Sequence, residues 1–333
     1  MIWSIQYLRF FACLMVVTLH LTKKSYLNNG DGYLYFGASG VDIFFIISGF
    51  IMSYISNKKE TTSLDFIKNR TLRIYPIYLI TLIPFLGIFL AYPSIVNTHS
   101  LPPSIIKSIT LLPFLSGGSL NMVSWTLSYE FYFYIIYAIS LSIGKNAIRN
   151  SSIIIMTMLF LGHIFKIRFI SSMISLEFVF GMFIYEFIYN KVEVGIKKSI
   201  LLMLTGLCWI VFSSKAEVGG DDIIRVLYYG IPSALIFIGF LSTKIFSKKI
   251  NKLVLLGDAS YAIYLTHILT INAVYLVFKR IGMQETLYLP MIIIGVSLSI
   301  AIGLVVHLMI EKPVTKKLKS YPFFISKSTP INS

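Results

Sequence analysis

Ten apolar segments of helix length divide this 333-residue chain, and they constrain its fold more than any single motif. The hydrocarbon core of a bilayer is spanned by a helix of about 20 apolar residues, whose backbone satisfies its own hydrogen bonds. Only 13% of the residues are charged, about half the share found in soluble proteins. The sequence therefore predicts an all-α integral membrane protein, a bundle of about ten transmembrane helices rather than a barrel. We place the spans at 4–22, 40–56, 74–92, 124–143, 151–166, 169–189, 199–213, 223–243, 256–278 and 288–310.

The basic residues predict how this bundle is oriented. Most of the 29 lysines and arginines fall on one side, chiefly in 57–73, 190–198, 244–252 and the tail. Cytoplasmic loops carry the excess of basic residues, so this side is cytoplasmic, and an even number of spans places both termini there. The net charge of +15 then reflects topology and contact with membrane lipids, not nucleic acid. We expect a multi-pass protein of a bacterial cytoplasmic (inner) membrane, and the richness in Ile, Lys and Asn is typical of an AT-rich bacterial genome.

The chain is predicted to have one domain. Residues 1–315 form the transmembrane domain, and 316–333 form a short basic cytoplasmic tail. The proline-rich segment 93–123 predicts an outer loop that partly re-enters the bundle. In the second span, Ser48-Gly49 predicts a close contact between helices, because small residues let membrane helices approach.

The first span holds two polar residues that are costly inside a bilayer, Arg9 and His20. Their separation is about three helical turns, so both lie on one face, roughly 16 Å apart along the axis. Ionisable residues are rare in membrane helices unless they have a function. Either Arg9 snorkels to the head groups and His20 caps the far end, or both belong to a reactive site. Their alignment favours the site.

A basic group at the cytoplasmic start of the third span suits phosphate, and it consists of Lys68, Arg70 and Arg73. Arg70 and Arg73 are three residues apart and therefore point the same way on a helix. Free backbone N–H groups at a helix N-terminus also favour anions. Two guanidiniums there can hold a phosphate through paired hydrogen bonds. The positive-inside rule alone explains basic residues at this end, but not their spacing.

Glu130 lies about one to two turns inside the outer boundary of the fourth span, among aromatic residues. A carboxylate within a membrane needs a partner, and His20 is the candidate at the most similar depth. Most of the aromatic residues are expected to form an interfacial belt, although Trp125 equally suits a groove for an acceptor.

Other polar residues of the spans allow more than one interpretation. Asp42, at the outer start of the second span, either caps that helix or contacts substrate. Tyr264 and His267 share a stripe that faces the bundle interior, where a structural hydrogen bond is the first expectation for His267. His163 and Glu177, in the fifth and sixth spans, are expected to pair with each other.

Taken in order along the chain, these segments resemble the acyltransferase-3 family of membrane proteins. The resemblance covers nearly the whole chain through motifs at 5–9 with His20, 40–49, 70–76, 125–132, 260–267 and 311–313. Each motif is weak alone, but six in this order are specific. The first helix and the Gly-Val-Asp-Ile-Phe-Phe segment are most similar to the branch that O-acetylates exopolysaccharide and O-antigen.

The resemblance implies an O-acyltransferase that moves an acetyl group from cytoplasmic acetyl-CoA to a sugar hydroxyl of a cell-envelope polysaccharide. It also implies that Arg9 and His20 are essential. Arg70 and Arg73 match the family's paired arginines, and Glu130 matches its acidic residue after the tryptophan. The expected partners are acetyl-CoA, a lipid-linked or polymeric envelope glycan, membrane lipids and, as a further option, polysaccharide-assembly proteins. No metal is expected.

Three groups of residues are then expected at the site. We assign catalysis to His20, Glu130 and Arg9, acetyl-CoA binding to Arg70, Arg73 and Lys68, and acceptor binding to Trp125, Asp42, Ser128, Tyr264 and His267. His20 either removes the proton of the sugar hydroxyl while Glu130 orients its ring, or is itself acylated and passes the group outward. The sequence leaves both routes open.

Three other functions compete with acyl transfer. A transporter or flippase for lipid-linked glycans is expected to show inverted repeats and broken helices, and the sequence shows neither. A polysaccharide polymerase is expected to have a large outer loop rich in arginine, whereas 93–123 carries Lys107 as its one basic residue. A non-enzymatic scaffold leaves the alignment of Arg9 with His20 unexplained.

Overall fold

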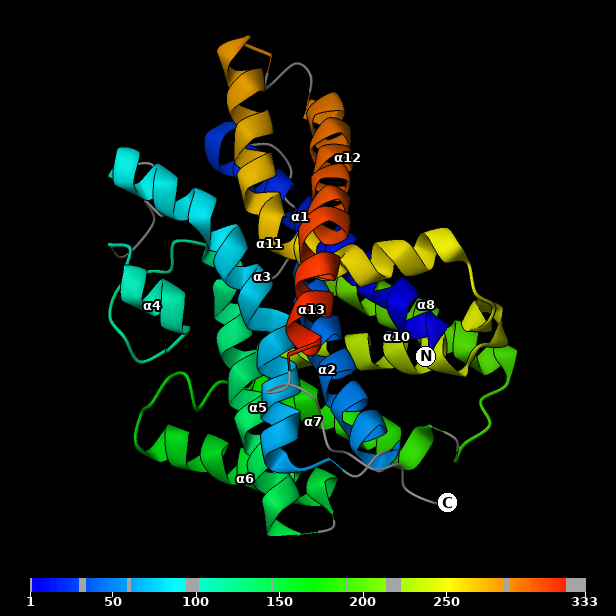
Figure 1. Ribbon diagram of the computed structural model, residues 1–333. Coiled ribbons are helices and arrows are strands. Elements are labelled where there is room, and N and C mark those ends of the chain that lie inside the picture. The colour runs from blue at the N-terminus through cyan, green and yellow to red at the C-terminus, as the bar shows by residue number, and fades with distance from the viewer. Residues whose placement is uncertain are drawn as a thin grey trace.

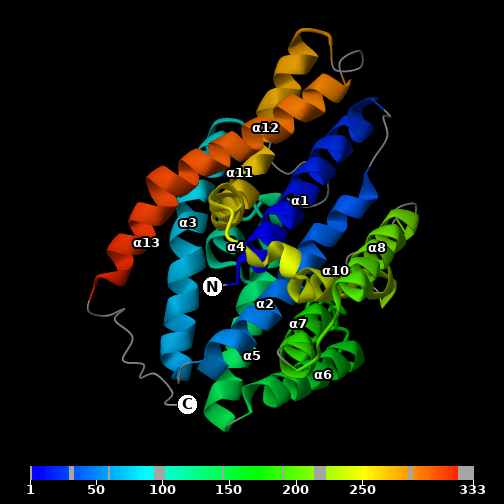
Figure 2. The same cartoon turned by 90° about the vertical axis from the view of Figure 1, so that its right-hand side faces the viewer.

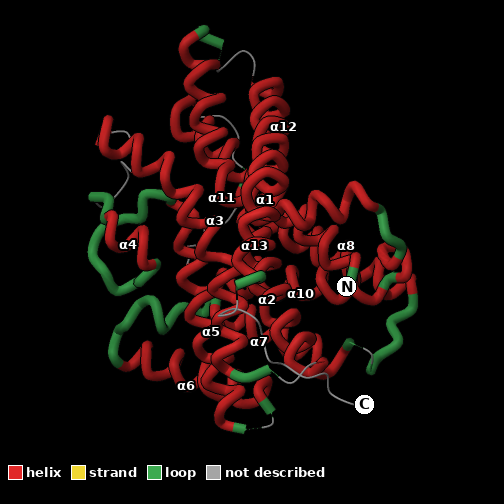
Figure 3. The backbone as a smooth tube through the Cα atoms, in the orientation of Figure 1, coloured by secondary structure: helices red, strands yellow, loops and turns green. Residues whose placement is uncertain are grey.

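The computed structural model describes residues 2–29, 34–58, 61–93, 102–144, 146–189, 191–213, 223–283 and 288–321. Within these ranges the chain is almost entirely helical (Figure 3), with one isolated β-bridge between Pro103 and Gly118. The predicted all-α fold is confirmed for these residues. Most of the predicted tail, 322–333, lies outside them.

The helices follow the predicted spans in order along the chain (Figure 1). The longer ones are α1 (Trp3–Asn29), α2 (Ser39–Lys58), α3 (Ser63–Ala91), α5 (Trp125–Ile143), α6 (Ala147–Ile164), α7 (Ser175–Phe183), α8 (Ile196–Ser213), α10 (Ile231–Ser242), α11 (Asn251–Arg280) and α12 (Tyr288–Val306). The short helices are α4 (Ile105–Thr110), α9 (Ile223–Arg225) and α13 (Lys312–Lys319). The described residues also form three π-helical turns. η4 (Ile184–Ile188) extends α7, η5 (Val226–Gly230) joins α9 to α10, and η7 (His307–Glu311) joins α12 to α13.

Eight helical segments of the described chain are long and apolar enough to cross a bilayer. The two other predicted spans contain α5, whose tyrosines and Glu130 lower its hydropathy, and α7, which is short. The span expected to start at residue 169 starts at Ser175, because turns occupy 165–174. The chain is therefore a multi-pass helical membrane protein.

Three helices form the centre of the bundle. The most apolar stretches of α1, α2 and α11 are 67%, 72% and 67% buried, whereas those of α8 and α12 are only 22% buried. In Figure 2, α12 and α13 lie on one side of the molecule, α6 and α8 lie on the other, and α1 and α2 run between them. The outward faces of α8 and α12 carry large apolar side chains, such as Phe212 and Leu289, which suits contact with lipid.

Side-chain caps fix where some of these helices begin. The Thr62 hydroxyl accepts a hydrogen bond from the Asp65 backbone N–H at the start of α3, at 3.1 Å. The Asn146 side chain accepts one from the Arg149 N–H at the start of α6, at 2.9 Å. Each cap satisfies a backbone donor that the first helical turn leaves free. Because α3 begins at Ser63, Arg70 and Arg73 lie about two to three turns inside the helix, and the expectation that they sit at its N-terminus beside free backbone N–H groups is wrong.

The backbones of α2 and α7 touch at Gly49. A Cβ atom on Gly49 would collide with the carbonyl oxygen of Phe178, so no larger residue fits while the helices keep this distance. The predicted close contact at Ser48-Gly49 is confirmed. It seats α2 in the bundle with Ser48 directed toward α5.

The described part of the outer loop packs into the bundle, as expected. The Tyr75 hydroxyl of α3 donates a hydrogen bond to the carbonyl oxygen of Ile109 in α4, at 2.6 Å. Asn121 is fully buried, and its amide donates to the carbonyl oxygen of Leu265 in α11, at 3.1 Å. Residues 94–101 lie outside the described chain.

Candidate active site

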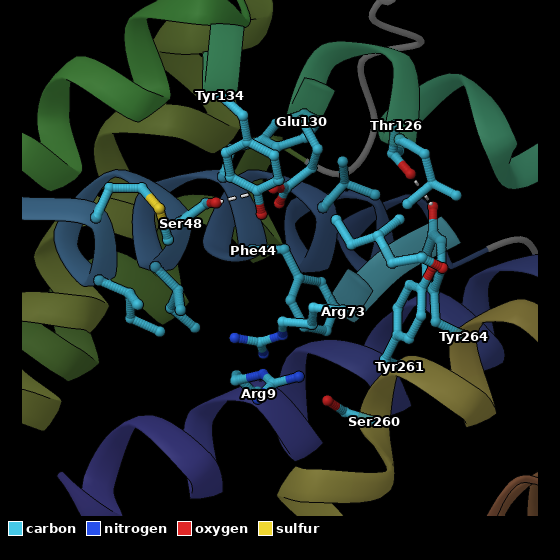
Figure 4. Close-up of a pocket in the computed structure, with 17 residues that line it drawn as sticks. Arg9, Phe44, Ser48, Arg73, Thr126, Glu130, Tyr134, Ser260, Tyr261 and Tyr264 are labelled. Atoms are coloured by element: carbon cyan, nitrogen blue, oxygen red, sulfur yellow. Dashed lines mark hydrogen bonds between the residues drawn. The ribbon is translucent and has the colours of Figure 1, made fainter. Parts of the chain in front are cut away.

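A cavity of about 100 Å³ lies where α1, α2, α3, α5 and α11 converge (Figure 4). Apolar side chains of α2 form much of its wall. Its polar lining comprises Arg9, Ser48, Arg73, Thr126, Glu130, Tyr134, Ser260, Tyr261 and Tyr264. Since a water molecule needs roughly 10–15 Å³ of such space, the cavity has room for the narrow part of an extended ligand.

Two arginines from different helices share this cavity. The guanidiniums of Arg9 on α1 and Arg73 on α3 lie side by side in it (Figure 4). Arg9 is 8% exposed and donates a hydrogen bond to the Gln6 side chain at 3.2 Å, while Arg73 is exposed. With Glu130 as the one carboxylate of the lining, the cavity carries net positive charge and suits an anion.

Glu130 projects from α5 into the same cavity. The Ser48 hydroxyl of α2 donates a hydrogen bond to its carboxylate at 2.9 Å, and Tyr134 lies beside it. Arg73, Arg70 and Arg9 all lie close enough to Glu130 for their positive charges to interact with its carboxylate. The carboxylate is therefore placed to hold the arginines in position.

Arg70 does not line the cavity. It is 8% exposed, its guanidinium lies 5.5 Å from the centre of the Phe66 ring, and its Nε has no partner among the described residues. Arg73 is exposed and lines the cavity, whereas Arg70 is buried outside the lining, so a shared direction of the two side chains stays a prediction. Lys68 is half-buried and also lies outside the lining.

His20 has a different neighbour from the one we expected. It does not line the cavity, and its ring lies 5.2 Å, between centroids, from the ring of His267 on α11. Glu130, the expected partner, is instead hydrogen-bonded to Ser48. The depth argument paired the wrong groups, because it could not order the helices around the bundle.

Tyr264 connects the cavity to this histidine pair. Its ring lines the cavity, and its hydroxyl is hydrogen-bonded to the Thr126 hydroxyl at 2.9 Å (Figure 4). His267 lies one turn further along α11, with its ring centre 5.7 Å from that of Tyr264. The predicted stripe of Tyr264 and His267 is confirmed, and Ser260, one turn before Tyr264, also lies in the cavity wall.

Two other residues expected to contact the acceptor lie near the outer loop. Trp125 is 39% exposed, and its ring packs edge-on against those of Phe45 and Tyr129. The Ser128 hydroxyl donates a hydrogen bond to the carbonyl oxygen of Leu111, at 2.8 Å, and so ties α5 to the loop after α4. Neither lines the cavity. Their contact with acceptor stays a prediction.

Asp42 belongs to a separate buried cluster. Its carboxylate accepts a hydrogen bond from the Arg225 guanidinium at 2.7 Å, with Asp42 0% exposed and Arg225 8% exposed at the side chain. Glu177 is also fully buried and lies close enough to Asp42 and Arg225 to interact electrostatically with both. The expected pair of His163 and Glu177 is wrong, since His163 is exposed on α6. Sequence analysis missed Arg225, although a charged residue in a span at the depth of Asp42 was a usable signal.

The chain matches the acyltransferase domain family over residues 2–308. It is 31% identical over 310 residues to the exopolysaccharide production protein ExoZ of Rhizobium meliloti (strain 1021), covering 84% of this chain and 90% of that protein. It is 31% identical over 148 residues to the acyltransferase MdmB of Streptomyces mycarofaciens, covering 40% of this chain and 38% of that protein. No solved structure matches the chain.

Proposed function

The chain belongs to the acyltransferase-3 family and is a membrane acyltransferase, and from that premise we propose that it transfers an acetyl group from cytoplasmic acetyl-CoA to a sugar hydroxyl of a cell-envelope polysaccharide. The observation that carries this proposal is the cavity in which Arg9 and Arg73 lie side by side next to Glu130. Family membership sets aside the transporter, polymerase and scaffold interpretations.

The paired guanidiniums support a polyanionic donor. Acetyl-CoA carries phosphate groups at one end and its thioester at the end of a thin, flexible arm. Guanidinium binds phosphate through two parallel hydrogen bonds, and this bonding is strongest where water is excluded. Arg73 is exposed and Arg9 is buried, so phosphate would meet Arg73 first while the arm enters the cavity past Arg9.

The acceptor step requires a base. The sugar hydroxyl oxygen attacks the thioester carbonyl carbon, the new C–O bond forms as the C–S bond breaks, and the hydroxyl proton moves to a neutral imidazole of His20. The proton then passes to the departing thiolate, so the reaction consumes and releases none overall. The second route, transient acylation of His20, uses the same position.

The proposed class of acceptor is based on the similarity of this chain to a known protein. ExoZ, which aligns with this chain over 90% of its own length, is named for exopolysaccharide production. Exopolysaccharide or O-antigen, lipid-linked or polymeric, is therefore the proposed acceptor, in a bacterial inner membrane and alongside polysaccharide-assembly proteins. We propose that Trp125 and Ser128, which lie next to the outer loop, contact the glycan.

The direct test uses protein purified into lipid nanodiscs, acetyl-CoA labelled with ¹⁴C in the acetyl group, and envelope glycan freed of esters by mild alkali. We expect label to enter the glycan as an alkali-labile ester in the presence of wild-type protein. Preparations of Arg149→Ala, an exposed arginine on α6, should perform equally. Absence of both label transfer and acetyl-CoA binding would contradict the proposal.

A further inference from the structure

Two imidazoles face each other between the first helix and α11. The ring centroids of His20 and His267 are 5.2 Å apart and the rings are tilted by 45°. His267 is fully buried, whereas His20 is partly exposed. At this separation, rotation of the His20 ring brings one of its nitrogens within hydrogen-bond range of His267.

The packing of α1 against α11 fixes this pair. A Cβ atom on Gly257 would collide with the carbonyl oxygen of Gln6, so the backbones of the two helices nearly touch there. Further along, the Cys13 thiol donates to the carbonyl oxygen of Ser260 at 3.4 Å. The contacts advance together along both helices, which therefore run parallel. The histidines follow seven residues later on each helix, close to two turns, and so meet again.

The hydrogen bond of His267 determines which of its nitrogens carries the proton. Its Nδ1 lies 2.6 Å from the carbonyl oxygen of Tyr264. A carbonyl oxygen only accepts, so Nδ1 is the donor and a neutral His267 has its lone pair on Nε2. Nε2 is buried and has no partner among the described residues. A buried acceptor left unpaired is costly, which points to a donor that a small rotation brings to it.

His20 is the donor within reach. The neighbouring titratable groups with the largest electrostatic effect on His20 are His267 and Lys23, and neither is a carboxylate. A catalytic histidine with one nitrogen acting as base has an N–H on its other nitrogen that needs an acceptor. Nε2 of His267 is that acceptor.

We propose that His267 is the positioning residue of His20. In this arrangement the carbonyl oxygen of Tyr264 accepts from Nδ1 of His267, and Nε2 of His267 accepts the N–H of His20. The remaining nitrogen of His20 then carries its lone pair toward the acceptor hydroxyl. When that nitrogen takes the hydroxyl proton, the imidazolium stays hydrogen-bonded to His267 until the proton leaves to the thiolate. The inference rests on the proposed acyl transfer, but it places a neutral imidazole where acyl-transfer triads have a carboxylate.

The kinetic test compares two substitutions of His267 in nanodisc-embedded protein. Phenylalanine keeps the ring but accepts no hydrogen bond, whereas glutamine supplies both an amide donor for Tyr264 and an oxygen acceptor for His20. We expect His267→Phe to lower kcat for glycan acetylation about 100-fold, within the range of general-base effects, with KM for acetyl-CoA changed less than about twofold. His267→Gln should recover at least about tenfold of that loss.

The matched control is His163→Phe, the same exchange at an exposed histidine of α6, which should keep wild-type kinetics. Full activity of His267→Phe overturns the inference. A His267→Gln variant no better than His267→Phe also overturns it, because a packing role favours the ring of phenylalanine over glutamine. A wild-type protein that transfers no acetyl group defeats the proposed function instead.

A second measurement does not depend on turnover. In protein labelled with ¹⁵N-histidine, we expect His267 to show the tautomer protonated at Nδ1, as its bond to Tyr264 requires. His20→Ala should shift the Nε2 resonance of His267, because it removes the donor. An unchanged Nε2 resonance, or protonation at Nε2, overturns the inference even if the enzyme is active.

Discussion

Arg9 and Arg73 are far apart in sequence, and their guanidiniums reach one cavity because α1 and α3 both pack against α11. Like charges this close repel unless a counter-charge is present. Glu130 supplies one such charge from α5, held by Ser48. A bound phosphate would supply a second, and this is the residue-scale basis of the proposed donor site.

Replacing Arg73 tests that donor site. We expect Arg73→Ala to weaken acetyl-CoA binding about 10- to 100-fold, which corresponds to the loss of one charge-assisted hydrogen bond of about 1.5–3 kcal/mol. Calorimetric titration of nanodisc-embedded protein measures it. Arg149→Ala, which removes an exposed arginine, is the control. Equal affinities of wild type and Arg73→Ala would remove Arg73 from the site.

Glu130→Gln separates a charge partner from a direct ligand contact. Glutamine keeps an oxygen for the Ser48 hydroxyl but removes the negative charge that opposes a phosphate in the cavity. We therefore expect Glu130→Gln to bind acetyl-CoA at least as tightly as wild type, measured by the same titration. Weaker binding would mean that the carboxylate is needed in the donor site, either to contact the donor or to hold the arginines in position.

The residue types at the site were predictable, but their partners were not. The stripe through Tyr264 and His267 follows from helical periodicity. The neighbour of His20 depends on which helix packs beside α1, and one amphipathic sequence does not specify that order. Arg225 was missed for the same reason, since its partner lies on a distant helix.

At the scale of elements, the Asp42–Arg225 pair joins α2 to the start of the α9–α10 segment. Removing one partner leaves the other as an unpaired buried charge, at a cost of about 3–5 kcal/mol. Removing both partners leaves no unpaired charge from this pair. We expect Asp42→Ala and Arg225→Ala each to lower the melting temperature more than the double variant does. Thermal unfolding of detergent-solubilised protein measures this. A double variant as unstable as the two single losses combined would show that the pair has no energetic coupling.

The contact between α2 and α7 gives a second prediction at this scale. Gly49→Ala places a Cβ against the Phe178 carbonyl and should destabilise the protein by about 1–3 kcal/mol. Gly87→Ala, on the exposed face of α3 with open space around it, should instead stabilise by up to about 1 kcal/mol. Melting temperatures of the two variants should move in opposite directions. A Gly49→Ala variant as stable as wild type would contradict the close contact.

Element positions followed hydropathy closely except at the start of α3, which begins at Ser63 and not at 74, and before α7. Residues 169–174 are largely apolar, which is why the span was expected to begin there. In the structure they form turns, and Phe169 stacks on Tyr129 of α5 with ring centres 4.3 Å apart. Hydropathy indicates that such a segment is buried but not which backbone conformation it adopts. The buried turn was therefore assigned to a helix.

At the scale of the whole molecule, the groups we assign to the reaction follow one line along α1 and α11. Arg9, the cavity, Tyr264 and the His20–His267 pair succeed one another along these parallel helices. Both are central helices, and lipid-facing helices such as α8 and α12 surround them. This arrangement suits a donor that enters from the cytoplasm and an acceptor that meets the acetyl group nearer the outer face.

The measurement that tests this account most directly is NMR of the surface polysaccharide from cells that lack this gene, complemented with wild type or His20→Ala at equal membrane levels. The account predicts acetyl esters on the glycan with wild type and none with His20→Ala. Full acetylation by His20→Ala would contradict the catalytic line along α1. Loss of glycan chain length or surface exposure, with ester content per sugar unchanged, would contradict acyl transfer to the glycan.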